Sequence, residues 1–236
     1  MSLSKPREIS PTRRFFRIRG ATGDVVYYDK AKQDEVAVEL PFRFIVLDVL
    51  NTIGGFHEPS NSGIWSNEVR YVDELFTVRT RDGVFARGTW EEIRDKVKGA
   101  GGKFGNSVYL AYKDENGEWA QGNLHLIGAA VSNFFDFKKT RLFDQDPGVA
   151  ITGFTQQKKG RNEYFVPNFE GWDVPAEDLL VATKMDEALQ VWLENRGNRD
   201  NDSQPSAPEP APAPRPTAFP QQQSFGGGSL DAEPPF

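Results

Sequence analysis

Short runs in which apolar and polar residues alternate dominate the first 170 positions, and an alternation of period two is the pattern of β-strands. Residues 107–113 show it most clearly, since Val108, Leu110 and Tyr112 share one face while Tyr109 and Lys113 share the other. Runs that flank a short turn predict β-hairpins. The predicted hairpins join residues 14–19 to 25–28, 75–80 to 84–87, and 149–156 to 163–169, with further strands at 42–50 and 123–127.

Helical periodicity is restricted to three segments. Thr89 and Glu92 have the spacing of a capping box, so a helix is predicted from there to about residue 98. Two further helices are predicted at residues 130–137 and 184–195. The positions expected to be buried are Trp90, Ile93 and Val97 in the first helix and Ala188, Leu189 and Trp192 in the last.

Many short strands with few helices between them predict a mainly β fold. We expect an OB-fold-like Greek-key barrel with one to three short helices, formed by residues 1–196. A different β-rich α+β domain is the alternative that the same elements allow.

Residues 51–67 fit neither period, and we predict a long irregular loop there. Long loops in compact domains usually have a function or are mobile. Trp65 within this segment is either an exposed platform for stacking or a plug that folds the loop onto the core.

From residue 197 onward the chain is rich in Asn, Asp, Ser, Gln, Pro, Ala and Gly. Such a composition has too little apolar surface to offset the entropy lost on folding, so a disordered tail is expected. We divide it into a Pro/Gln/Gly-rich linker at residues 197–230 and an acidic tip at residues 231–236.

Charge is distributed unevenly along the chain. The net charge is −6, but residues 1–167 hold 24 Lys and Arg against 22 Asp and Glu, whereas residues 168–236 hold 4 against 12. This asymmetry suggests a body that binds nucleic acid, followed by an acidic tail.

The residue inventory limits the kinds of site. No cysteine is present, so disulfides, thiol catalysis and cysteine-ligated zinc are excluded. With only two histidines, His57 and His125, we expect no metal and no cofactor. No apolar run is long enough to cross a bilayer and no signal peptide is visible, so we expect a cytoplasmic protein without a membrane partner.

No catalytic residue is predicted. The glycines of residues 99–107 do not form a phosphate-binding loop, because Lys103 is followed by Phe104 and these glycines follow the predicted helix instead of preceding one. Carboxylates cluster at residues 73–74 and 91–95, where we interpret those of the helix as a solvated surface. A magnesium-dependent nuclease, which needs converging carboxylates, is the alternative from a different functional class.

Cations interleaved with aromatic residues recur at several predicted hairpins. Binding a single strand without reading its sequence requires cations along the phosphates and flat side chains on which bases stack. For each single residue the alternative is a core aromatic or a solvated cation, and the recurrence of the pattern favours binding. The candidate DNA-binding residues are Arg13, Arg14, Arg17, Trp65, Arg79, Arg81, Lys103, Phe104, Tyr109, Lys158, Lys159 and Arg161.

The last six residues carry the features of a docking peptide. Two prolines restrict the backbone, so less entropy is lost on binding. The terminal residue offers a ring for an apolar pocket and a free carboxylate, and the acidic residues would be attracted to a basic rim. The candidate partner-binding residues are Asp231, Glu233, Pro234, Pro235 and Phe236.

In this organisation the chain resembles the single-stranded DNA-binding proteins of bacteria and phages. The tip of the bacterial proteins is typically Asp-rich and ends in Ile-Pro-Phe; here Pro234 replaces the Ile and Ala232 dilutes the charge. The body is longer than the bacterial one and is more similar to the phage-encoded type, through residues 149–154, the Lys-Lys-Gly-Arg turn at 158–161 and residues 164–167.

The resemblance implies a non-enzymatic protein that coats single-stranded DNA during replication, recombination and repair, in a bacterial cell or a phage-infected host. It also implies that the tip recruits a polymerase, a helicase or a recombinase, and a homo-oligomer is a further partner to consider. The alternatives are a strand-annealing or recombination-mediator protein and an RNA-binding OB domain.

Overall fold

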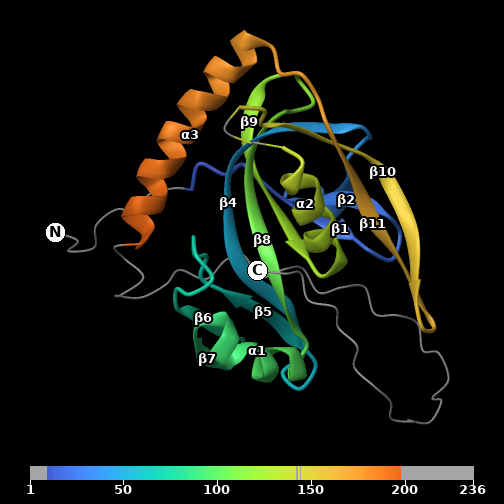
Figure 1. Cartoon of the computed structure of the whole chain (residues 1–236), viewed down its shortest axis with the longest axis vertical. Coiled ribbons are helices and arrows are strands. Elements are labelled where there is room, and N and C mark those ends of the chain that lie inside the picture. The colour runs from blue at the N-terminus through green and yellow to red at the C-terminus, as the bar shows by residue number, and fades with distance from the viewer. Residues whose placement is uncertain (1–9, 142, 144, 198–236) are drawn as a thin grey trace. The chain divides into compact units, whose positions relative to one another are not determined.

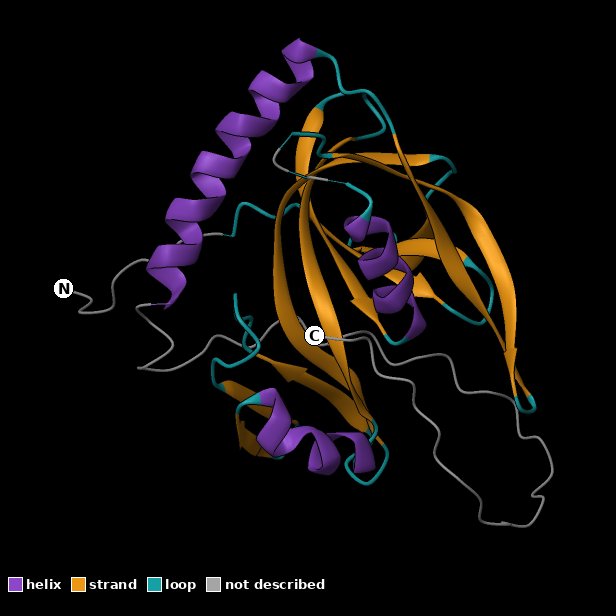
Figure 2. Cartoon of the chain, viewed as in Figure 1, coloured by secondary structure: helices purple, strands orange, loops and turns teal. Residues whose placement is uncertain are grey.

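The computed structural model describes residues 10–141, 143 and 145–197, of which strands hold 50% and helices 23% (Figures 1 and 2). The predicted mainly β fold with three helices is confirmed. The predicted linker and tip lie outside the described residues, apart from Gly197. The strands are β1 Arg14–Arg19, β2 Asp24–Asp29, β3 Asp34–Ala37, β4 Phe42–His57, β5 Ser62–Ser66, β6 Phe76–Thr80, β7 Gly83–Gly88, β8 Gly102–Lys113, β9 Trp119–Ile127, β10 Gly148–Lys159 and β11 Asn162–Gly171. The helices are α1 Trp90–Gly99, α2 Ala129–Lys139 and α3 Ala176–Gly197.

One mixed sheet contains all eleven of these strands. They follow the order β3-β2-β1-β9-β8-β4-β5-β6-β7, while β10 joins β4 and pairs with β11. The β1–β9 pair is parallel and the β8–β9 and β4–β8 pairs are antiparallel. The backbone N–H of Phe165 in β11 donates to the carbonyl of Gly20, just after β1, at 2.7 Å. Among the described residues the sheet is therefore curled like the predicted barrel, but strand pairing does not close it.

The main core lies between the curled sheet and α2. Because successive residues of a strand point to opposite faces, β8 turns Val108, Leu110 and Tyr112 into this core, as its alternation predicts. Phe134 of α2 joins the same cluster and is 1% exposed. Burial of this apolar surface is the main stabilising contribution to the body of the protein.

A second, smaller core lies beneath α1, near the end of β4. The predicted capping box of α1 is confirmed, since the backbone N–H of Thr89 donates to Oε2 of Glu92 at 2.8 Å. The predicted burial of three α1 residues is confirmed as well. This core contains Ile53, Ile64, Val69, Phe76, Val78, Ala86, Trp90, Ile93 and Val97.

The prediction of an irregular loop at residues 51–67 is wrong. Strand β4 continues to His57, β5 begins at Ser62, and the two strands pair with Trp65 opposite Gly54. Three glycines interrupt the alternation of apolar and polar residues in this segment, which is why the pattern does not reveal the strands.

The last helix is longer than predicted, because α3 begins at Ala176 instead of near residue 184. Apolar residues occur all round its first turns, so no apolar stripe marks its start. It buries Ala182 and Leu189, whereas Trp192 is half-buried. Ala188, predicted to be buried, is exposed, because one residue is a rotation of about 100° around a helix. None of the described helices is both long and apolar enough to span a membrane.

Candidate nucleic-acid interface

The strand register brings four residues from four neighbouring strands into one row. Trp65 of β5 lies opposite Arg79 of β6 and opposite Gly54 of β4, and Gly54 in turn lies opposite Lys103 of β8. Directly opposite residues of a sheet point to the same face, and neighbouring strands are about 4.8 Å apart. We call Arg79–Trp65–Gly54–Lys103 the Trp65 row. It presents two cations and an indole ring on one face, with no side chain at Gly54.

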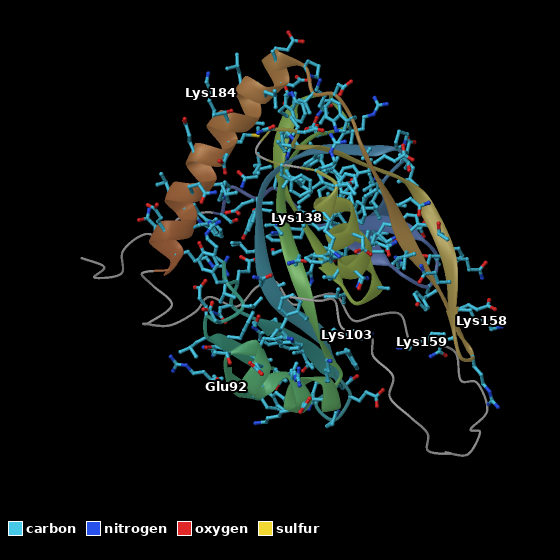
Figure 3. All side chains as sticks on the ribbon, in the orientation of Figure 1. Glu92, Lys103, Lys138, Lys158, Lys159 and Lys184 are labelled. Atoms are coloured by element: carbon cyan, nitrogen blue, oxygen red, sulfur yellow. The ribbon has the colours of Figure 1, made fainter. Side chains whose placement is uncertain are left out.

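The opposite face of the same strands is buried against α1. Ile64 and Val78, the chain neighbours of Trp65 and Arg79, have exposed fractions of 4% and 0%. The alternation along β5 and β6 therefore turns the Trp65 row away from the small core, where Lys103 is exposed and Trp65 and Arg79 are half-buried. Figure 3 shows Lys103 at the end of β8 that lies near α1.

The cations of the Trp65 row have no acidic partner among the described residues. Neither Arg79 nor Lys103 forms an ion pair with any of them, and Nε of Arg79 is buried without a hydrogen-bond partner. A buried donor left unsatisfied costs about 1–3 kcal/mol. Arg87 of β7 lies opposite Thr77 of β6, which places it on the same face as Arg79, and its side chain is exposed. Arg81 is also exposed, in the turn that follows β6.

Side chains of β9 cover Gly54. A Cβ atom at Gly54 would lie 2.6 Å from Cε1 of His125 and 3.5 Å from Cγ2 of Ile127, so both side chains reach over β8 towards β4. Burial lowers the pKa of His125 from its ordinary value of 6.5, and its Nε2 has no hydrogen-bond partner within the described part of the chain. The space above Gly54 is therefore filled by these two side chains of β9.

The predicted arginine cluster of β1 is differently placed, because its members hold carboxylates. Arg13 and Arg14 each form an ion pair with a carboxylate that lies 101 positions further along the chain. A bound carboxylate offsets the attraction of each arginine for a phosphate. The ion pairs are Arg13 with Asp114 and Arg14 with Glu115, both at 2.8 Å, and Arg17 and Arg19 with Glu35.

The hairpin cations form a separate group. Lys158, Lys159 and Arg161 lie exposed at the tip of the β10–β11 hairpin, and Nζ of Lys158 is 3.3 Å from a carboxylate oxygen of Glu163. The hairpin joins the sheet at Phe42–Ile45 of β4, whereas the Trp65 row meets β4 at Gly54. In Figure 3 Lys158 lies farther from Lys103 than Lys159 does.

The structure corrects the assignment of Tyr109 as a stacking platform and packs Phe104 against both cores. Tyr109 is 2% exposed, because α3 covers that part of the sheet, and its hydroxyl donates to Oε2 of Glu68 at 2.7 Å. Burial also raises the pKa of Tyr109. Phe104 is partly buried between the two cores and lies 5.3 Å, centre to centre, from the ring of Trp90. Tyr109 therefore offers no free face to a base, and Phe104 is partly exposed.

Sequence reasoning missed other members of this face. Phe56 lies two residues beyond Gly54 in β4 and therefore on the same face, with an exposed fraction of 51%, and Ile127 is 37% exposed. Both are apolar residues at positions where the alternation of a strand should place polar ones, and this exception could have pointed to a binding face. The glycines around Phe56 concealed the strand, so the exception could not be recognised.

No family model, curated protein or solved structure matches this chain. Among the described residues, no group of three or more His, Asp or Glu side chains could hold a metal ion. The geometry of the Trp65 row is therefore the evidence from which a function can be argued.

Proposed function

We propose that the protein binds single-stranded DNA on the face that carries the Trp65 row, without reading its sequence and without catalysis. The observation that carries the proposal is an indole ring flanked in the register by two cations, neither paired with a carboxylate in the described part of the chain. Stacking on an aromatic ring and neutralisation of phosphates are the two contributions that such binding needs.

The row has the dimensions of a contact with one strand. Three strand spacings separate Arg79 from Lys103, which is roughly 14 Å, so the two cations can hold phosphates on either side of a base that lies on Trp65. A base that lies on Trp65 is bordered by His125 and Ile127, whose side chains fill the space above Gly54. Because every base has a π-face, stacking accepts any sequence.

The acidic tip completes the proposal. Asp231, Glu233, Pro234, Pro235 and Phe236 recruit a polymerase, a helicase or a recombinase to the coated strand, in replication, recombination or repair. The support for this part is the sequence alone, through the terminal ring and carboxylate. Its test is capture of such a partner by the full chain and by a chain that ends at residue 230.

Binding itself is tested by titrating a labelled oligo-dT with the full-length protein at increasing salt. Two or three neutralised phosphates should lower the affinity roughly tenfold between 50 and 200 mM salt, because each releases counterions. A duplex competitor should be weak, and an oligo-U competitor separates DNA from RNA preference. Absent or salt-independent binding contradicts the proposal.

A further inference from the structure

The outer side of α3 carries a stripe of exposed residues that no described residue covers. Leu180 and Val191 are 67% and 60% exposed, and Lys184 and Glu187 between them are exposed too. Neither of these two charged residues forms an ion pair within the described part of the chain. Figure 3 shows Lys184 directed away from the sheet, and Figure 2 shows α3 along the border of the molecule.

The spacing of this stripe is that of a coiled-coil seam. Positions 180, 184, 187 and 191 follow one another at intervals of four, three and four residues, which keeps them on one side of a helix. The inner side of α3 uses other positions, since Ala182 and Leu189 pack on the sheet. The helix therefore has two separate apolar sides, of which only the inner one is covered.

The stripe is complementary to itself when two copies are antiparallel. Leu180 and Val191 lie equally far from the midpoint between residues 185 and 186, and Lys184 and Glu187 do as well. A two-fold axis at that midpoint places Leu180 of one copy against Val191 of the other, and Lys184 against Glu187. Each such pair occurs twice, so the interface holds two apolar pairs about 16 Å apart along the helix, with two ion pairs between them.

We propose that the protein forms a homodimer through antiparallel pairing of its α3 helices along Leu180, Lys184, Glu187 and Val191. The occupant of the stripe is a second copy, because the charge order Lys–Glu and the apolar ends are complementary to a copy of the same helix that runs in the opposite direction. The pairing is isologous, so it closes at two copies and does not grow into a fibre.

The same register also predicts a weakness. It places Glu177 of one copy opposite Glu194 of the other, and both are exposed. Like charges at the two ends oppose association, and salt screens them. With few apolar residues in the seam, the dimer should be weak and concentration-dependent.

Sedimentation velocity of the full-length protein, without DNA and over a range of concentrations, tests the dimer. The wild-type chain should associate reversibly as its concentration rises. Lys184→Glu places like charges opposite each other twice and should raise the dissociation constant by about tenfold or more. The double variant Lys184→Glu with Glu187→Lys restores both pairs and should dimerise within about threefold of wild type.

A gain-of-association variant and a matched control complete the test. Glu194→Lys converts the repulsion at both ends of the dimer into attraction and should tighten the dimer several-fold. Lys138→Glu, an exposed charge reversal on α2, should leave association unchanged. A monomer at every concentration, or a double variant that stays as weak as Lys184→Glu, overturns the proposal. Circular dichroism confirms that each variant is folded.

Discussion

Replacing Trp65 with alanine is expected to weaken binding of oligo-dT by about tenfold to a hundredfold, because stacking of a base on an aromatic side chain contributes about 1–3 kcal/mol. The indole is half-buried on the outward face of β5, where Trp65 lies between Arg79 and Gly54 in the register. It is not among the residues of the small core, so its removal should leave that core intact. The measurement is the dissociation constant at fixed salt, with unfolding followed in parallel.

The matched control is Phe15→Ala. Phe15 is 54% exposed on β1, in the strand whose arginines hold carboxylates. The Phe15→Ala variant should change the affinity for oligo-dT by less than about threefold, since an exposed ring beside paired arginines contributes little to binding of a single strand. A larger loss with Phe15→Ala than with Trp65→Ala would move the interface to β1 and contradict the location proposed here.

The second large effect is on stability. Phe16→Ala should lower the free energy of unfolding by about 3–5 kcal/mol, because it removes a fully buried ring and leaves a cavity. Phe16 is 2% exposed, and its ring centre lies 4.9 Å from that of Phe42 and 5.0 Å from that of Tyr112. Such a loss is a large part of the 5–15 kcal/mol that typically stabilises a domain.

Urea unfolding measures this effect against the neighbouring residue. Phe15→Ala removes the same atoms one position earlier in β1, but from the exposed face, and should cost less than about 1 kcal/mol. Equal losses at the two positions would show that the alternation of β1 does not place Phe16 alone in the main core.

The hairpins and the main core could be predicted because both depend on period two. The alternation of Val108, Leu110 and Tyr112 fixes which face of β8 is buried, and turn residues fix where each hairpin folds back. The strands β4 and β5 escaped prediction around Gly54, because a glycine has no side chain to reveal which face it belongs to. The start of α3 escaped for the opposite reason, since apolar residues on both of its sides leave no stripe.

The site could be predicted only in part, because pairing partners lie far apart along the chain. Arg17 and Arg79 are alike in local sequence, each in a strand with aromatic neighbours. Tertiary structure separates them, since Arg17 meets Glu35 on β3, two strands away in the sheet, and Arg79 meets no carboxylate among the described residues. Tyr109 shows the same limit. The alternation along β8 correctly places Tyr109 outside the main core, but α3 covers the face of the sheet that Tyr109 occupies.

The central claim is that DNA binds to the cations of the Trp65 row, which no carboxylate of the described residues pairs, and not to the paired arginines of β1. The most direct test is the slope of log affinity against log salt for oligo-dT, measured for Arg79→Ala and Arg17→Ala beside the wild type. Arg79→Ala should reduce the magnitude of the slope by about 0.7, the loss of one phosphate contact to a single strand, and Arg17→Ala should leave it unchanged. An unchanged slope for Arg79→Ala with a reduced slope for Arg17→Ala would contradict the account.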